Sequence, residues 1–215
     1  MKIKKIFIIC LVGVIIALIG VGGFLVYKEF FSGGDNKKKN EVVDKIKGYN
    51  YSLENGAPKE YKKMFESLVK TLKQSEIDEE EYASLVARMF VYDFYDIKNK
   101  MSKNDVGGTQ FVLASSVDNF VLEAGETTYK YVEHNIYGDR QQSLPEVSSV
   151  AVAEIKKEKF NYKTLIDDNA YNIKLDIIYK EETTGYPKTV TVKLIHTTFG
   201  EEENSKTKLE VIYLY

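Results

Sequence analysis

The sequence has few of the residues that build metal centres and thiol chemistry. Its 215 residues include one cysteine, two histidines and no tryptophan. The cysteine, Cys10, lies in an apolar run near the N-terminus, so the rest of the chain has no disulfide, cysteine zinc site or thiol nucleophile. H-E-x-x-H, G-x-S-x-G and glycine-rich phosphate-loop motifs are also missing. We therefore expect no metal, no cofactor and no enzymatic activity.

Arginine is scarce as well, because Arg88 and Arg140 are the only arginines among 30 basic residues. Seven lysines and two acids lie in the first forty residues, which leaves 23 basic and 30 acidic groups in the remainder, a net charge of about −7. Nucleic-acid-binding domains use arginine and a positive surface to hold phosphates. The composition therefore argues against nucleic acid as a partner.

Charge is absent from one stretch, Ile6–Tyr27, with the sequence IFIICLVGVIIALIGVGGFLVY. As a helix, these 22 residues span about 33 Å, enough to cross a hydrocarbon core of about 30 Å. A cleaved signal peptide is the alternative, since Lys2, Lys4 and Lys5 precede the run, but no Ala-x-Ala site follows it. We predict a basic head at residues 1–5 and a single-pass anchor in the cell membrane.

Lysines flank this span on both sides, with Lys28 and Lys37–Lys39 after it, so the positive-inside rule discriminates little. Long domains translocate largely regardless of charge, and we expect the domain outside the cytoplasm. Residues 28–41 are rich in glycine, asparagine and lysine and predict a flexible stalk, whose lysines could alternatively contact anionic headgroups. Residues 42–215 are long enough for one domain with its own core.

Apolar residues recur at helical spacing in three stretches of that domain. The first stripe begins after Lys59 and consists of Tyr61, Met64, Phe65, Leu68, Val69 and Leu72. The second helix is predicted to begin after Asp78, whose carboxylate can cap it while Glu81 completes a capping box. The third is predicted to run from Ser115 or Ser116 to about His134–Asn135.

Period-two alternation replaces the helical spacing after Pro145. Four long strands are predicted, in Ser149–Tyr162, around Tyr171–Tyr179, in Thr189–Phe199 and in Lys206–Tyr215. The connections between them, Asp167–Asn169, Glu181–Pro187 and Gly200–Ser205, are short enough for an antiparallel meander. Short strands are expected at Gly48–Leu53 and Thr109–Leu113. The sequence thus predicts an α+β fold in which helices pack on a curved antiparallel sheet.

This order of elements resembles the NTF2-like α+β cone. With an anchor and a stalk before it, the layout is similar to the membrane-tethered VirB8-type components of bacterial conjugation machines, including their TcpC-like Gram-positive relatives. The resemblance covers Tyr61–Tyr215 by element order. It implies a non-enzymatic interaction or scaffold domain that assembles with other membrane proteins or with itself.

Three titratable residues are candidates for a site because they fall on apolar faces. Asp93 lies in the middle of the second helix's apolar stripe, Asp96 lies near its edge, and His196 lies on the apolar face of its strand. We expect Asp93 to be held by a buried partner such as a tyrosine hydroxyl, a lysine or a helix amide, and His196 by a tyrosine hydroxyl or a backbone carbonyl. The alternatives are a pocket enzyme that pairs Asp93 with His196, and binding of a small molecule or peptide in an aromatic cavity.

Overall fold

The computed structural model describes residues 41–162, 165–199 and 206–214. Val42–Tyr215 forms one compact unit. The predicted anchor, Ile6–Tyr27, lies outside the described residues, as does all of the predicted stalk except Glu41. In the part of the chain that the structure describes, no helix is both long and apolar enough to cross a membrane.

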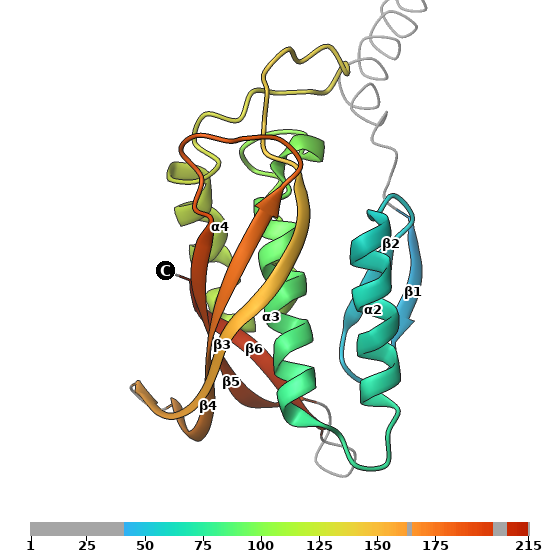
Figure 1. Ribbon diagram of the computed structural model, residues 1–215, viewed down its shortest axis with the longest axis vertical. Helices are drawn as coiled ribbons and strands as arrows, with labels where there is room; N and C mark the ends of the chain where they lie inside the picture. The colour runs from blue at the N-terminus through green and yellow to red at the C-terminus, as the bar shows by residue number, and fades with distance from the viewer. Residues whose placement is uncertain (1–40, 163–164, 200–205, 215) are drawn as a thin grey trace, which may run out of the picture. The chain divides into compact units, whose positions relative to one another are not determined.

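The unit is an α+β arrangement of helices and antiparallel sheets (Figure 1). Its elements are β1 (Val42–Ile46), β2 (Tyr51–Glu54), α2 (Lys59–Leu72), α3 (Glu79–Tyr95), α4 (Val117–Glu126), β3 (Val147–Tyr162), β4 (Leu165–Tyr179), β5 (Thr189–Phe199) and β6 (Lys206–Leu214). The short 3-10 helices Ile97–Asn99, Thr109–Phe111 and Ala114–Ser116 lie between α3 and α4. β1 pairs with β2, and β3 to β6 form a meander in chain order, as the alternation predicted.

Helix α3 lies between α2 and the inner face of the four-stranded sheet, which curves around it (Figure 1). It begins after Asp78, whose carboxylate accepts hydrogen bonds from the backbone N–H groups of Glu80 and Glu81, both at 3.1 Å. This confirms the predicted N-cap. Eleven of its seventeen residues are buried. A helix buried on several sides must find partners inside the protein for the polar groups at its end.

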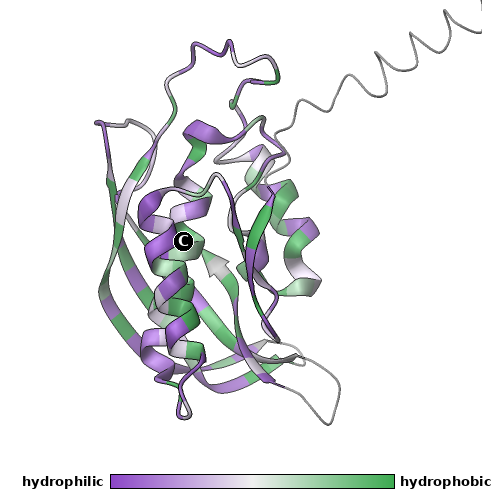
Figure 2. Ribbon diagram, turned by 90° about the vertical axis from the view of Figure 1, so that its right-hand side faces the viewer, coloured by the Kyte–Doolittle hydropathy of each residue, from purple (hydrophilic) through white to green (hydrophobic). Residues whose placement is uncertain are grey.

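Hydrophobic and hydrophilic residues alternate along the strands (Figure 2). The residues buried on the inner face of β4 and β5 are Tyr171, Ile173, Leu175, Ile177, Val190, Val192 and Leu194. They follow the predicted period-two alternation, whereas Tyr179 and His196, which the same pattern places on this face, are only half-buried. Such alternation is typical of an antiparallel sheet with one face on the core.

Tyrosine hydroxyl groups join the β1–β2 hairpin to the rest of the unit. The Tyr51 hydroxyl donates to the carbonyl of Leu209 in β6 at 3.0 Å and shares a hydrogen bond of 2.8 Å with the hydroxyl of Tyr82 in α3. The backbone N–H of Leu209 donates to the Tyr82 hydroxyl at 3.1 Å. The backbone N–H of Ser52 also donates to the side chain of Gln110 at 2.8 Å. β2, α3 and β6 therefore meet in one buried polar cluster.

The predicted end of the third helix, at about His134–Asn135, is wrong, because α4 stops at Glu126. Thr127 has φ −121° and ψ −97°, outside the helical region. The chain then turns so that the fully buried Tyr129 packs in the core. His134, expected at a helix C-terminus, instead lies exposed in the connection to β3. The helical spacing of apolar residues continues past Glu126 because later residues such as Tyr129 pack in the core without being part of a helix.

Other boundaries differ in the same way. Asp167–Asn169, predicted as a loop, lies inside β4. Thr109–Leu113, predicted as a strand, begins as the 3-10 helix Thr109–Phe111, and Val112 alone forms a bridge to Val211 of β6. β1 was not predicted, because four of its five residues are exposed and give it no alternating pattern.

Leu68→Ala should lower the free energy of unfolding by about 2–5 kcal/mol, because Leu68 of α2 is fully buried in the core. Leu122→Ala is the matched control, since Leu122 of α4 is 68% exposed and its truncation should change stability by about 0.5 kcal/mol or less. Denaturant unfolding of the full chain in mild detergent, followed by circular dichroism, measures both. Equal losses would contradict the described packing of α2.

Candidate functional site

Asp93 is a hydrogen-bond acceptor that ties the chain after α3 back onto the helix. Its carboxylate accepts from Lys100 Nζ at 2.6 Å and from the backbone N–H of Gly108 at 2.7 Å. Burial of Lys100 disfavours its charged form, but the charge of Asp93 and its hydrogen bond outweigh burial and raise the pKa of Lys100. The expected lysine partner of Asp93 is confirmed.

Two glycines allow this returning chain to lie directly against α3. A Cβ atom at Gly107 would lie 2.0 Å from the backbone oxygen of Asp93. At Gly108, which has φ +77°, a Cβ atom would lie 2.7 Å from the ring of Phe90. Larger residues would push the turn off the helix, so the Asp93 carboxylate and the Gly107–Gly108 pair form one structural unit.

Asp96 and Tyr129 complete the bonding around the C-terminal end of α3. The Asp96 carboxylate, in a residue only 6% exposed, accepts from the backbone N–H of Val147 at 2.9 Å. Burial raises the pKa of Asp96, although the Val147 bond acts against this. The Tyr129 hydroxyl donates to the carbonyl of Phe94 at 2.5 Å and accepts from Gly107 at 3.2 Å. Together with Asp93 and Lys100, these groups form what we call the α3 terminal network.

His196 has a different partner from the one that a catalytic pair would need. Its ring Nδ1 lies 2.8 Å from the carboxylate of Asp167, which also accepts from the His196 backbone N–H at 2.8 Å. Burial of Asp167 favours its neutral form, but hydrogen bonds from the backbone N–H groups of His196 and Asn169, and from the His196 ring, hold the pKa of Asp167 below its ordinary value. The histidine is thus held by a strand neighbour, where a tyrosine hydroxyl or carbonyl was expected.

The structure does not bring Asp93 and His196 together. The Nε2 atom of His196 lies 4.0 Å from the carboxylate of Glu79, the first residue of α3. Asp93 comes fourteen residues later, about 21 Å along the helix axis. Asp93 and Asp96 belong to the α3 terminal network, and His196 belongs to a separate contact at the other end of the helix. The described residues also contain no group of three acids, histidines or cysteines placed to hold a metal ion.

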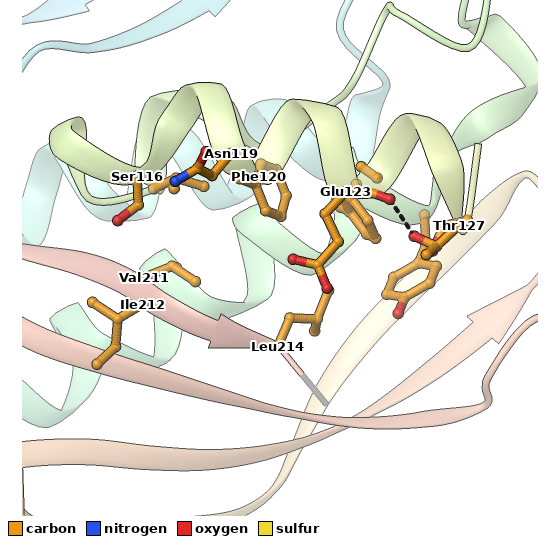
Figure 3. Close-up of a pocket in the computed structure, with 13 residues that line it drawn as sticks. Ser116, Asn119, Phe120, Glu123, Thr127, Val211, Ile212 and Leu214 are labelled. Atoms are coloured by element: carbon orange, nitrogen blue, oxygen red, sulfur yellow. Dashed lines mark hydrogen bonds between the residues drawn. The ribbon is translucent and has the colours of Figure 1, made fainter. Parts of the chain in front are cut away.

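A hollow of about 370 Å³ lies elsewhere, between α4 and β6. Asn119, Phe120 and Glu123 project from α4 into the space above β6 (Figure 3). Its apolar lining is Phe94, Tyr95, Val112, Phe120, Ala124, Val211, Ile212 and Leu214, and its polar lining is Ser116, Asn119, Glu123, Thr127 and Thr128. Burial raises the pKa of Tyr95 to about 12, so its phenol is neutral at physiological pH. We call this hollow the α4–β6 groove.

The mixed lining of the groove can hold a ligand by apolar contact and hydrogen bonds. This lining contains no pair of titratable groups arranged for proton transfer. No ion pair involves Glu123 among the residues that the structure describes. β6 is the last strand of its sheet, and its outer edge meets the chain at Val112 and Leu113, where Leu113 N–H donates to Val211 at 2.9 Å. Residues 212–214 continue beyond this contact along the groove.

Neither Asp93, Asp96 nor His196 lines the groove. A sequence signal for it exists, because Ser116, Asn119, Glu123 and Thr127 fall on one side of a helix, next to Phe120. Because the prediction of this helix followed its apolar stripe, this polar row was not recognised as a possible site. The sequence alone also gave no indication that β6 would lie opposite it.

The chain matches no protein-family profile, no curated protein and no solved structure.

Asp93→Asn should lower the free energy of unfolding by about 1–3 kcal/mol, because the 16%-exposed Lys100 side chain loses its counter-charge. Asp118→Asn is the control, since Asp118 is an exposed acid of α4 and its loss should change little. Denaturant unfolding of the full chain measures the difference. Equal stability of the two variants would show that the Asp93 contacts are not structural.

Asp167→Asn should cost about 1–2 kcal/mol at pH 7, because charge-assisted bonds to His196 and Asn169 are lost. The folded-state pKa of Asp167 lies below the ordinary value of 3.8, so this stabilisation is complete above about pH 5 and lost as the pH falls through 3.8 and below. The stability difference from wild type should therefore shrink in acid. Asp168→Asn, which removes an exposed ion pair with Lys159, should show almost no difference at either pH.

Proposed function

We propose that the chain is a non-enzymatic, single-pass membrane protein whose α+β domain binds other membrane proteins or a second copy of itself. The observation that carries this proposal is the α4–β6 groove beside the outer edge of β6, a place where an extended segment of a partner can pack. Addition of a strand at a sheet edge takes affinity from main-chain hydrogen bonds and specificity from neighbouring side-chain pockets.

The candidate residues for chemistry support the same proposal. The carboxylates of Asp93 and Asp96 accept structural hydrogen bonds, and the imidazole of His196 is held by Asp167. A pocket enzyme that uses Asp93 and His196 would need these side chains within reach of one another, and they lie at opposite ends of α3. An interaction domain needs no such pair.

The predicted anchor Ile6–Tyr27 supports a position at a membrane surface, and the expectation that a long domain translocates largely regardless of charge supports the outside of the cytoplasm. The element order resembles the NTF2-like cone, and the layout resembles tethered VirB8-type and TcpC-like components. A scaffold role in a secretion or conjugation-like envelope assembly follows from that resemblance. The net charge of about −7 after residue 40 and the scarcity of arginine argue against nucleic acid as the partner.

A second candidate function is binding of a small molecule or short peptide in the same groove. A volume of about 370 Å³ is within the usual range of ligand pockets, about 300–1,000 Å³. Phe94, Tyr95 and Phe120 supply aromatic surface, while Asn119 and Glu123 supply polar groups that could orient a ligand. A ligand of this kind would saturate purified protein without any second polypeptide.

Asn119→Trp should reduce partner recovery about tenfold or more, because an indole would fill the groove between α4 and β6. Asp118→Trp is the matched control on the adjacent exposed position, which does not line the groove. The measurement is crosslinking in intact cells that express the full chain, followed by pull-down and quantification of specific membrane proteins and of crosslinked copies of the chain. Recovery of background alone with the wild type would contradict the proposal, and equal recovery with both variants would exclude the groove as the contact.

A further inference from the structure

The connection between α4 and β3, residues 127–146, contains no helix or strand and displays hydrophobic side chains. Tyr137 is 90% exposed, Tyr131 is 77% exposed and Ile136 is 54% exposed. Connections of this length without secondary structure are uncommon in compact domains and are usually functional or disordered. We call residues 127–146 the display loop and Ile136–Tyr137 its tip.

The display loop is held in place by hydrogen bonds. The Arg140 guanidinium donates to the carbonyl of Lys100 at 2.8 Å, to that of Lys98 at 2.6 Å and to that of Glu133 at 3.1 Å. The backbone N–H of Asn135 donates to Met101 at 2.9 Å. The display loop is therefore fastened to the segment that follows α3.

The tip itself is a tight turn. The N–H of Gly138, which has φ +74°, donates to the carbonyl of Asn135 at 3.2 Å, and the Asn135 side chain accepts from Arg140 N–H at 3.1 Å. This geometry directs Ile136 and Tyr137 outward in a fixed conformation. A preorganised apolar tip loses little conformational entropy when it is buried by a partner.

The display loop lies at the same end of the unit as the start of β1 (Figures 1 and 2). The predicted anchor ends at Tyr27, which leaves the fourteen residues 28–41 between the membrane and Val42. A flexible chain of that length has an end-to-end distance of about 20 Å. With the anchor of the proposed function in the membrane, a tether of that length would keep the start of β1 within about 20 Å of the bilayer surface.

The chemistry of the tip suits a bilayer interface. Tyrosine is enriched at membrane interfaces, where its ring lies in the apolar layer and its hydroxyl stays near the headgroups. Between residues 130 and 140, Lys130 and Arg140 balance Glu133 and Asp139 in charge. We propose that the Ile136–Tyr137 tip inserts into the interface of the bilayer that holds the anchor and so fixes the orientation of the domain. This inference rests on the anchor of the proposed function.

The chain has no tryptophan, so Tyr137→Trp creates a single fluorescent reporter at the tip. The full chain is reconstituted into phosphatidylcholine vesicles with brominated acyl chains, and emission is compared with that in unbrominated vesicles. Trp at 137 should be quenched about twofold or more by the bromine atoms. Gln74→Trp, in the exposed connection between α2 and α3 at the opposite end of the unit, should keep its emission (Figure 1).

A second substitution separates insertion from mere proximity. Ile136→Asp added to Tyr137→Trp should abolish the quenching, because a carboxylate resists entry into the apolar layer. Ile178→Asp, at a position of β4 that is 57% exposed, should leave the quenching unchanged. Vesicle flotation is run in parallel, because protein that fails to float would overturn the anchor and the inference together. Protein that floats with unquenched Trp at 137, or with the tip crosslinked to another protein, would overturn the inference and leave the proposed function standing.

Discussion

The buried C-terminal end of α3 is the constraint on which the rest of the unit depends. A helix leaves carbonyl groups without partners at its end, and here that end lies among packed side chains where water cannot satisfy them. The Tyr129 hydroxyl donates to the carbonyl of Phe94. The carboxylates at this end also have donors: Lys100 and the Gly108 N–H for Asp93, and the Val147 N–H for Asp96. Val147 is also the first residue of β3, so the bond to Asp96 fixes where the sheet begins relative to the helix.

Sequence patterns predicted the helices and strands more completely than the side-chain contacts between them. The spacing of apolar residues was sufficient to predict α2 and the four-strand meander, because an element buried on one side carries apolar residues at a regular interval. The start of α3 was predicted from its N-cap. Asp93 was correctly recognised as needing a partner, yet Lys100 and Gly108 could not be assigned, since their proximity depends on a turn made possible by two glycines. Asp167 was placed in a loop because Asp-Asp-Asn favours turns, whereas pairing with Phe160 of β3 and the bond to His196 keep it in a strand. The groove was missed because it needs two elements far apart in the sequence.

The α4–β6 groove and the display loop are two surface features whose positions depend on different hydrogen bonds. The groove lies against β6, whose position depends on the hydroxyl bonds of Tyr51 and Tyr82 to Leu209. The display loop depends on Arg140 and on the carbonyls that follow α3. Both are supported by α3, so a partner in the groove and a bilayer at the tip would meet a common rigid support. An anchored domain with such a support can present the groove at a fixed height and angle.

The β1–β2 hairpin has a mechanical consequence for a tethered protein. A pull on the chain ahead of Val42 loads the Val42–Glu54 pair first and the Ile46–Tyr51 pair last, which is the geometry of unzipping. The five residues of β1 would yield one pair at a time and add about 17 Å of reach. β2 would stay in place, because the Tyr51 hydroxyl and the Ser52 amide hold it to β6 and to Gln110. In a chain anchored as proposed, β1 would therefore detach before the rest of the unit comes under load.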